Sequence, residues 1–463
     1  MPKVKESNAA KVKAIVNEFK DFTISPTEKL FCQVCSCIVK HEKRFFVEQH
    51  LATLKHKKGI EARTTRSSAL QQAFIHPVQL NDFTSQLVRA FASSVIPLVK
   101  VQHPSIRKLF VDLGKTVPSE SACRQKVFEL SEADNQKLLD KLSEKELFFV
   151  MDETHLRGKK FLHTLCGTLD KPESCFLVKC SVLDRSPNSQ KIIHELDDVV
   201  KELKINTEQV NLLISDAAAY MCCAGKVLKE VYPKLLHVTC VAHLLHNCAL
   251  KIKASYPEVD NLIAKVKASI SKNRSRAADF DSCGIPPQPI VTRWGSWLNA
   301  TQYYAERLPQ VKEIVNAWEG EGVIVKSVKN SVNDPKLTSQ LTEICLHYNN
   351  ISNLILKMES CTYTIKEAHA DLNALDFGKD PLELKNYIKK RLDKNDVKQI
   401  MELQRQDISP ALYAKLQKCQ PTSASVERSF SLLKSFLRPN RNFKDSVSNI
   451  PHYMKLYYNS GLK

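Results

Sequence analysis

Three acidic side chains stand where they could act as ligands of a divalent metal ion. Asp152 ends the apolar run 147–151, and Asp216 ends a second apolar run, 210–215. Glu427 lies in a later segment that reads as the start of a helix. Carboxylate oxygens hold Mg²⁺ and Mn²⁺, and a pair of such ions can carry the in-line displacement of a phosphodiester. Two acids at strand ends and one on a late helix therefore predict a metal-dependent centre that acts on a nucleic acid.

Each of these acids also has a purely structural reading. Asp216 precedes an alanine run and would cap a helix through its side-chain oxygen. Glu427 can pair with Arg428 on a surface, and Glu153 offers a second carboxylate beside Asp152. Asp152 is the preferred ligand because it directly ends the apolar run.

A zinc-ligand spacing, Cys-x2-Cys-x14-His-x5-His, lies near the N-terminus. Its members are Cys32, Cys35, His50 and His56. Thiolates on a knuckle and imidazoles on a helix, here expected over 45–58, converge on a tetrahedral Zn²⁺ ion. A unit this small depends on the metal for its folding free energy. The nearby pair Cys37 and His41 fits less well, since it would leave the helical histidines unused.

The distribution of charge predicts a polyanionic partner. The formal net charge is +18, and residues 1–70 hold 14 Lys and Arg against 7 Asp and Glu. Residues 411–463 hold 9 against 2, so the middle of the chain is nearly balanced. A solvated surface rich in lysine would also give this balance, but basic ends that overlap the motifs favour a nucleic acid, and the partner expected is double-stranded DNA. Three lysines that follow the expected finger helix are expected to contact the phosphates of the DNA. These are Lys55, Lys57 and Lys58.

Composition excludes several other classes of protein. Only 11 residues are glycine, which argues against a glycine-rich nucleotide fold. No apolar stretch is long enough for a membrane span, and the N-terminus lacks the apolar core of a secretory signal. The 15 cysteines are therefore expected to be reduced thiols plus a metal site in an intracellular protein.

Hydrophobic periodicity predicts an α/β protein in several parts. Apolar positions Phe83, Leu87, Phe91 and Val95 recur every fourth residue, and a helix should start near Pro104. We expect β-rich runs at 147–151, 161–168, 174–182, 210–215 and 235–239, with helices at 189–204, 217–230 and 241–253. This order fits a mixed sheet in which an antiparallel meander leads into parallel strands, as in a ribonuclease-H-like core.

The resulting layout has six parts: a basic leader (1–24), a zinc finger (25–60), a helical domain (71–145), the first part of the α/β core (146–254), a helical block (255–410) and a C-terminal part (411–463). Residues 61–70 have the polar bias of a linker. Loops are expected near 282–289 and 326–335. The apolar C-terminal helix is expected to pack partly on the core and partly against another copy of the chain.

Two sets of motifs resemble known families. The finger resembles a BED-type zinc finger, because the segment Leu51–His56 is similar to the usual end of that motif; Phe19 and Phe22 would replace its upstream Trp. Four blocks in the expected order resemble the hAT superfamily of DNA transposases, especially elements related to the CGG-repeat-binding proteins. These blocks are Ala90–Phe110, Val238–His246, Thr292–Trp297 and Ser423–Ser431.

The hAT resemblance, which covers roughly 25–463, implies a fold and an activity. Asp152, Asp216 and Glu427 match an Asp-Asp-Glu triad that holds Mg²⁺ or Mn²⁺ in a ribonuclease-H-like core, and 255–410 matches a helical insertion into that core. The resemblance also implies cut-and-paste transposition at terminal inverted repeats. The protein would act in the nucleus, as a homodimer or a higher oligomer. The segment after Asp152 departs from the family by lacking its usual Trp-Thr/Ser pattern. The alternative is a domesticated, non-catalytic DNA-binding regulator.

The resemblance also implies DNA contacts. Trp294 would stack on an extruded base, while Trp297 is expected to be core. Arg293, His243 and Arg428 are expected to contact DNA. Cys240 is expected to be buried rather than to form a second zinc site with His243, because no second Cys/His pair is suitably placed.

Overall fold

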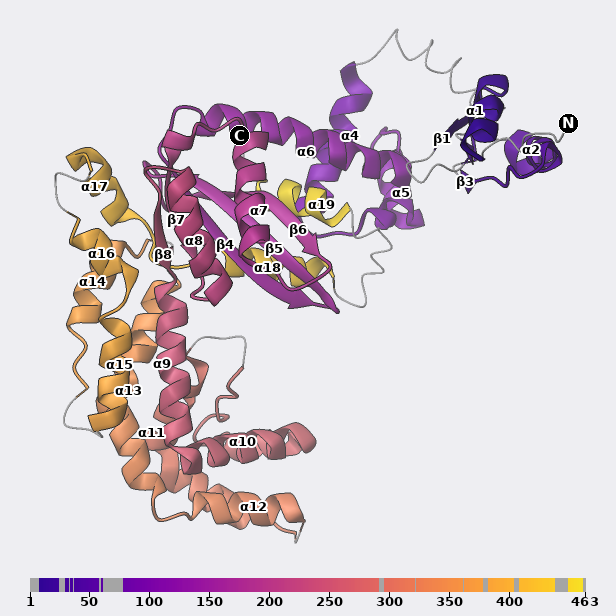
Figure 1. The fold of residues 1–463 in the computed structure, drawn as a ribbon. Helices are drawn as coiled ribbons and strands as arrows, with labels where there is room; N and C mark the ends of the chain where they lie inside the picture. The colour runs from indigo at the N-terminus through magenta and orange to yellow at the C-terminus, as the bar shows by residue number, and fades with distance from the viewer. Residues whose placement is uncertain are drawn as a thin grey trace, which may run out of the picture. The chain divides into compact units, whose positions relative to one another are not determined.

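The computed structural model describes most of the chain. The described residues are 8–24, 30–32, 34–35, 37–57, 60, 78–290, 295–320, 322–360, 362–377, 382–403, 408–437 and 449–460. The chain divides into two compact units, Met1–Thr84 and Ser85–Lys463 (Figure 1). No helix among the described residues is long and apolar enough to cross a membrane.

The first unit is a small α/β module. Its elements are α1 (Asn8–Glu18), β1 (Phe22–Ile24), β2 (Leu30–Cys32), β3 (Cys37–Ile38) and α2 (Arg44–Ala52). The three strands form one antiparallel sheet. Val12 of α1 and Val47 of α2 pack with Phe22 and Leu30 in one buried cluster. The packed module thus begins in α1, before the expected boundary at residue 25.

Helices come next along the chain: α4 (Val78–Ser93), which begins before the boundary at Ser85, η1 (Leu98–Gln102), α5 (Pro104–Asp112) and α6 (Glu120–Leu142). The predicted helix start at Pro104 is confirmed. The repeat of apolar residues that ends at Val95 extends beyond the helix. The helix α4 ends at Ser93, and Val95 has a φ of 54°. That left-handed conformation is unusual for a β-branched residue and ends the helix. Since Leu142 of α6 joins the core of the sheet, this helix is not a separate domain.

The sheet of the second unit has five strands. They are β4 (Leu147–Leu156), β5 (Lys159–Thr168), β6 (Cys175–Leu183), β7 (Val210–Ser215) and β8 (Leu236–Thr239), in the spatial order β6-β5-β4-β7-β8. β4 pairs antiparallel with β5, and β5 with β6, whereas β4–β7 and β7–β8 are parallel. The predicted strands and their mixed pairing are confirmed, and this sheet is compatible with a ribonuclease-H-like core.

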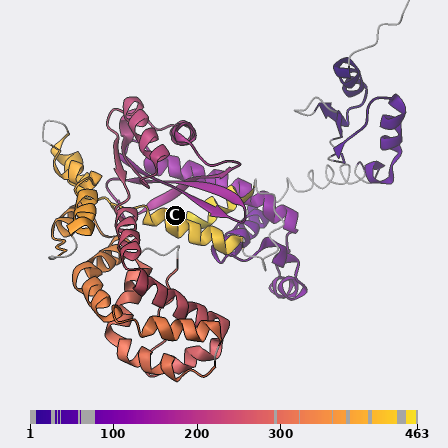
Figure 2. The same cartoon turned by 60° about the horizontal axis from the view of Figure 1, so that its bottom comes forward.

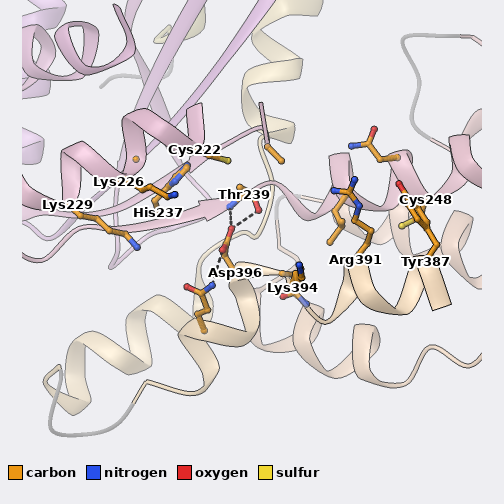
Figure 3. A pocket seen from close by; sticks show the side chains of 16 residues that line it. Cys222, Lys226, Lys229, His237, Thr239, Cys248, Tyr387, Arg391, Lys394 and Asp396 are labelled. Atoms are coloured by element: carbon orange, nitrogen blue, oxygen red, sulfur yellow. Dashed lines mark hydrogen bonds between the residues drawn. The ribbon is translucent and has the colours of Figure 1, made fainter. Parts of the chain in front are cut away.

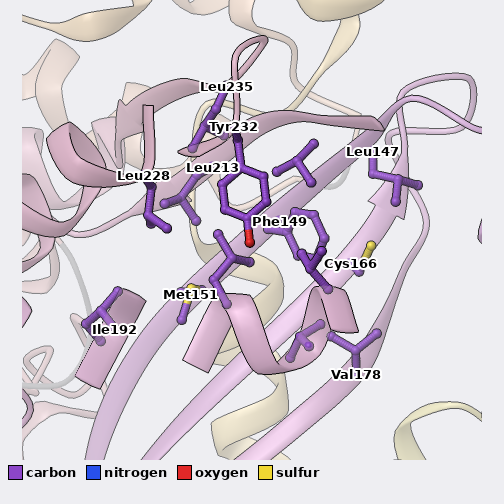
Figure 4. Close-up of a cluster of buried hydrophobic side chains, with 14 of the residues drawn as sticks. Leu147, Phe149, Met151, Cys166, Val178, Ile192, Leu213, Leu228, Tyr232 and Leu235 are labelled. Atoms are coloured by element: carbon purple, nitrogen blue, oxygen red, sulfur yellow. The ribbon is translucent and has the colours of Figure 1, made fainter. Parts of the chain in front are cut away.

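The side chains of β4 point alternately to the two faces of the sheet. Leu147, Phe149 and Met151 point into a buried cluster with α7 (Ser189–Glu202) and α8 (Ala219–Val231) (Figure 4). The other face is covered by α18 (Ala424–Phe436) and α19 (Ile450–Tyr458) (Figure 2). Successive side chains on a strand point to opposite faces, so Asp152 falls on the α18 face.

Between β8 and α18 the described residues are mostly helical. The elements are α9 (Val241–Ser255), α10 (Pro257–Lys272), η3 (Arg274–Phe280), α11 (Ser296–Ala317), α12 (Val323–Val332), α13 (Leu337–Met358), α14 (Ile365–Asn373), α15 (Leu382–Leu392), α16 (Asp396–Met401) and α17 (Pro410–Lys418). The loop expected near 282–289 is present, but most of 326–335 belongs to α12. Val325, Val328 and Val332 of α12 are buried, and this packing outweighs the polar residues between them.

Candidate metal centre

Strand pairing brings Asp152 and Asp216 to the same edge of the sheet. Val150 of β4 lies opposite Ile214 of β7 in the parallel register. Asp152 stands two residues beyond Val150, and Asp216 two residues beyond Ile214, so both acids continue the same face. Asp152 is buried, with 4% of its surface exposed, and Asp216 is partly exposed.

The third acid comes from α18. Ser423 precedes this helix, and its hydroxyl does not cap it; the hydroxyl instead donates to Asp152 Oδ2 at 3.1 Å. Glu427 lies four residues later, on the same side of the helix as Ser423. The helix is held on the sheet by a 2.7 Å hydrogen bond between Ser429 Oγ and His163 Nδ1 of β5. His163 pairs with Asp152 across the β4–β5 ladder.

A candidate metal-binding set forms here. One ligand atom from each of Asp152, His243 and Glu427 lies within 4.8 Å of the other two. Among the described residues, Asp216 does not belong to this tight set, although its charge still acts on Asp152 and His243. The donor set suits a divalent ion, because two carboxylates and an imidazole are ordinary ligands of such ions.

Burial and mutual repulsion disfavour ionised carboxylates in the absence of a metal. Burial is the main cause that raises the pKa of Asp152 to about 7, and the charges of Asp216 and Glu427 add to it. Burial likewise raises the pKa of Asp216 and of Glu427. Groups with such pKa shifts in one place are typical of functional sites, and a bound cation would favour their ionised forms.

His243 supplies positive charge to the same place. Burial alone would lower its pKa, but the neighbouring Cys240 and the acids Asp152 and Asp216 raise it to about 9. Ser423 Oγ lies 3.5 Å from His243 Nδ1, and the Ser423 amide donates to Cys240 Sγ at 3.2 Å. Cys240 is fully buried, as predicted. His243 therefore lies among the acids, where it can serve as a ligand or as a cation facing phosphate.

Glu153 lies away from this centre. Its position next to Asp152 on β4 turns it to the opposite face, where its Oε1 is 3.8 Å from Lys160 Nζ. Tyr220 of α8 hydrogen-bonds to Glu153, and burial raises the pKa of its hydroxyl. No local pattern singles out Ser423 or Tyr220, although Ser423 lies in the segment Ser423–Ser431 around Glu427.

The other residues expected to contact DNA have different settings. Arg428 is exposed, and its Nη1 donates to the carbonyl oxygen of Glu359 at 3.2 Å. Arg293 and Trp294 lie outside the described residues. Trp297 is buried and donates from Nε1 to Asp260 Oδ1 at 3.1 Å, which confirms its predicted core role.

The expected zinc ligands converge in the first unit. One ligand atom from each of Cys32, Cys35, His50 and His56 lies within 4.8 Å of the others. Both sulfur atoms are 3.5 Å from His56 Nδ1. Ligands about 2.3 Å (S) and 2.0 Å (N) from a tetrahedral zinc ion are separated by roughly this distance.

The surroundings of these ligands also suit a metal. Burial lowers the pKa of His50, which favours the neutral form that binds a metal. His56 Nε2 lies 3.3 Å from Asp21 Oδ2, a carboxylate that can orient the ring. Phe22 is buried, and its ring centroid is 5.9 Å from that of His50. Lys55 and Lys57 are exposed beside this cluster, and Lys58 lies outside the described residues.

Comparison with known proteins supports one coarse assignment. Residues 124–269 match a family described as Domain of unknown function (DUF659), which is associated with hAT-type, transposase-like domains. The match spans α6 to α10 and includes Asp152, Asp216 and His243, but neither Glu427 nor the first unit. The match supports the coarse assignment of a hAT-like protein and no closer relationship. No curated protein matches the chain.

Proposed function

We propose that the chain is a cut-and-paste DNA transposase of the hAT type whose cleavage centre is formed by Asp152, Asp216 and Glu427. One observation carries the proposal. Carboxylates from two adjacent parallel strands and from α18 gather on one face of a mixed sheet, in a setting that raises the pKa of all three. This is the arrangement expected of a ribonuclease-H-like nuclease.

The residues of the chain have distinct roles in this proposal. Asp152 and Glu427 bind Mg²⁺ or Mn²⁺, with His243 or Asp216 completing the ligand set. A bound ion would activate a nucleophile and stabilise the leaving oxygen of the phosphodiester. Ser423 orients Asp152 by its hydrogen bond, so the carboxylate oxygen that faces the ligand set is defined before an ion binds.

The remaining expectations belong to the same proposal. The first unit is a BED-type finger that binds structural Zn²⁺ and, through Lys55, Lys57 and Lys58, DNA phosphates. Arg293, Trp294 and Arg428 contact DNA near the cleavage point. The protein acts in the nucleus on terminal inverted repeats, as a homodimer or a higher oligomer assembled through its C-terminal part.

The test is cleavage of DNA that carries candidate element ends. Purified protein is expected to cut such DNA in the presence of Mg²⁺ or Mn²⁺ and not without them. The Asp216→Ala variant should bind the DNA and not cut it, whereas Glu153→Gln, on the other face of the sheet, should cut normally. Cutting by Asp216→Ala at the wild-type rate would refute the proposed centre.

A second candidate is a domesticated DNA-binding regulator without nuclease activity. It is favoured by the position of Asp216 outside the tight set of Asp152, His243 and Glu427. Tight binding of terminal-repeat DNA with no cutting in either metal would support this candidate over the first.

A further inference from the structure

A cavity of about 500 Å³ opens beside the acidic centre, at the ends of the parallel strands. Its walls come from α8, β8 and α9 on one side and from α15 and α16 on the other. Ala217, the residue directly after Asp216, lines it. The cavity therefore adjoins the proposed cleavage centre but shares none of its acidic side chains.

Four cationic side chains line the cavity, and we call them the cationic rim: Lys226, Lys229, Arg391 and Lys394. All four are exposed. Within the described part of the chain none of them forms an ion pair, in contrast to Lys201, Lys357 and Lys415 elsewhere. In Figure 3 the two lysines of α8 lie on one side of the cavity, with Arg391 and Lys394 on the other.

Among the described residues that line the cavity, Asp396 alone carries a carboxylate, and both of its oxygens already accept hydrogen bonds. Asp396 Oδ2 accepts hydrogen bonds from the amide and the hydroxyl of Thr239, at 2.9 and 2.6 Å (Figure 3). Its Oδ1 accepts from Gln399 Nε2 at 3.2 Å. Because four cations face one engaged carboxylate, the cavity carries a clear excess of positive charge.

His237 also lines the cavity, and hydrogen bonds through Ser215 connect it to the backbone of Asp216. His237 packs on Gly225 so closely that a Cβ there would lie 2.1 Å from His237 Nδ1, so only glycine leaves room for the ring. His237 Nε2 lies 2.9 Å from Ser215 Oγ, and Ser215 Oγ donates to the carbonyl oxygen of Asp216 at 2.9 Å. Tyr387 adds an aromatic wall with Arg391 above its ring, 5.5 Å from the centroid.

Three lysines and an arginine that form no ion pair with any described residue, around a cavity of this size, favour an anion with several oxygen atoms. A phosphate group meets that description, and Arg and Lys are its usual protein partners. The volume exceeds that of one phosphate and lies in the range of sites that hold a nucleotide-sized group. A DNA backbone that reaches Asp216 would have its next phosphates within a short distance of this cavity.

We propose that the cationic rim binds phosphate groups of the DNA backbone next to the bond that is cleaved. This proposal rests on the proposed function in taking DNA as the substrate. The same chemistry would also accept a free phosphorylated compound, so the test must separate these two sources.

The test measures DNA affinity against salt concentration with the full chain and no added divalent ion, so that no cutting is needed. The rim variant Arg391→Gln/Lys394→Gln is compared with Lys389→Gln/Lys390→Gln, which removes the same charge from α15 at exposed residues that do not line the cavity. Loss of two phosphate contacts should reduce the slope of log K against log salt by about 2. Between about 50 and 200 mM salt, the rim variant should therefore lose roughly tenfold less affinity than wild type. The control should keep most of the wild-type slope.

A second arm titrates the same proteins with inorganic pyrophosphate by calorimetry. Equal DNA slopes for the rim variant, the control and wild type would overturn the proposal, whether or not the protein cuts DNA. If the rim variant alone also loses pyrophosphate binding in that case, the ligand is a free phosphorylated compound instead. If the protein never cuts DNA but the rim variant has a reduced slope, the result would support binding of DNA phosphates by the cationic rim and would refute the proposed transposase activity.

Discussion

Ser423 Oγ donates a hydrogen bond to Asp152 Oδ2 at 3.1 Å, although 271 positions of the chain separate the two residues. The bond joins the start of α18 to β4 and orients the most buried of the three acids. The same hydroxyl lies 3.5 Å from His243 Nδ1, so one small side chain contacts both charged groups. Ser423 is therefore the residue through which the C-terminal segment organises the centre.

Replacement of Ser423 by Ala should slow cleavage without loss of the fold. An unsatisfied buried group costs about 1–3 kcal/mol, and 1.4 kcal/mol corresponds to about tenfold in rate. We expect single-turnover cleavage to fall by about tenfold or more. Ser425→Ala is the matched control, because Ser425 is buried in the same helix and its Oγ has no hydrogen-bond partner among the described residues. Equal rates for the two variants would contradict the assigned role of Ser423.

Metal binding should be visible as stabilisation of the folded protein. At a metal concentration of about 100 times Kd, a single site adds about 2.7 kcal/mol to the free energy of unfolding. Mn²⁺ should therefore raise the thermal midpoint of wild type, and Asp152→Asn and Glu427→Gln should each remove most of the shift. Glu153→Gln should keep the full shift, since this side chain faces Lys160 on the other side of the sheet. A shift that survives in Asp152→Asn would exclude this residue as a ligand.

Stability without metal should depend on pH through Asp152. Its pKa is raised from 3.8 to about 7, chiefly by burial. As pH rises from about 4 to about 7, the unfolded chain loses this proton while the folded chain keeps it, so the folded state loses stability. Each unit of difference in pKa corresponds to about 1.4 kcal/mol. Above pH 7, the metal-free Asp152→Asn variant should thus be more stable than wild type.

Denaturant titrations at pH 5 and pH 8 check this expectation, because the loss of stability between about pH 4 and about pH 7 falls mostly between these two values. The stability gained by Asp152→Asn over wild type should be larger at pH 8. Glu153→Gln provides the control for loss of one carboxylate from the same strand. A gain that does not change with pH would show that Asp152 is ionised in the folded protein throughout.

Zinc removal should unfold the first unit and leave the second intact. The module has one small buried cluster, and its four expected ligands already converge. Metal analysis should find about one zinc per chain in wild type and almost none in Cys35→Ser. Cys223→Ser, at an exposed cysteine of α8, is the control. Full proteolytic resistance of the first unit after chelation would rule out a structural zinc ion.

Much of the architecture is readable from local patterns. Apolar runs that end in Asp152 and Asp216 mark two buried strands, and the strand order indicates the mixed sheet. The spacing from Cys32 to His56 predicts the four side chains that converge in the first unit. Local patterns gave wrong boundaries where packing between elements decides the structure. The helix α12 spans most of a polar stretch that predicts a loop, and α1 contributes Val12 to the buried cluster of the first unit.

The sequence by itself determined that Asp152 and Asp216 follow the apolar runs of two buried strands and that Glu427 lies on a helix, because alternation and apolar length act over a few residues. Only the tertiary structure decided that His243 joins Asp152 and Glu427 more closely than Asp216 does, that Ser423 contacts Asp152, and that the four side chains of the cationic rim line one cavity. These relationships depend on how α9, α15 and α18 pack against the sheet. Distances between atoms on separate elements follow from that packing, and no local pattern of residues specifies them.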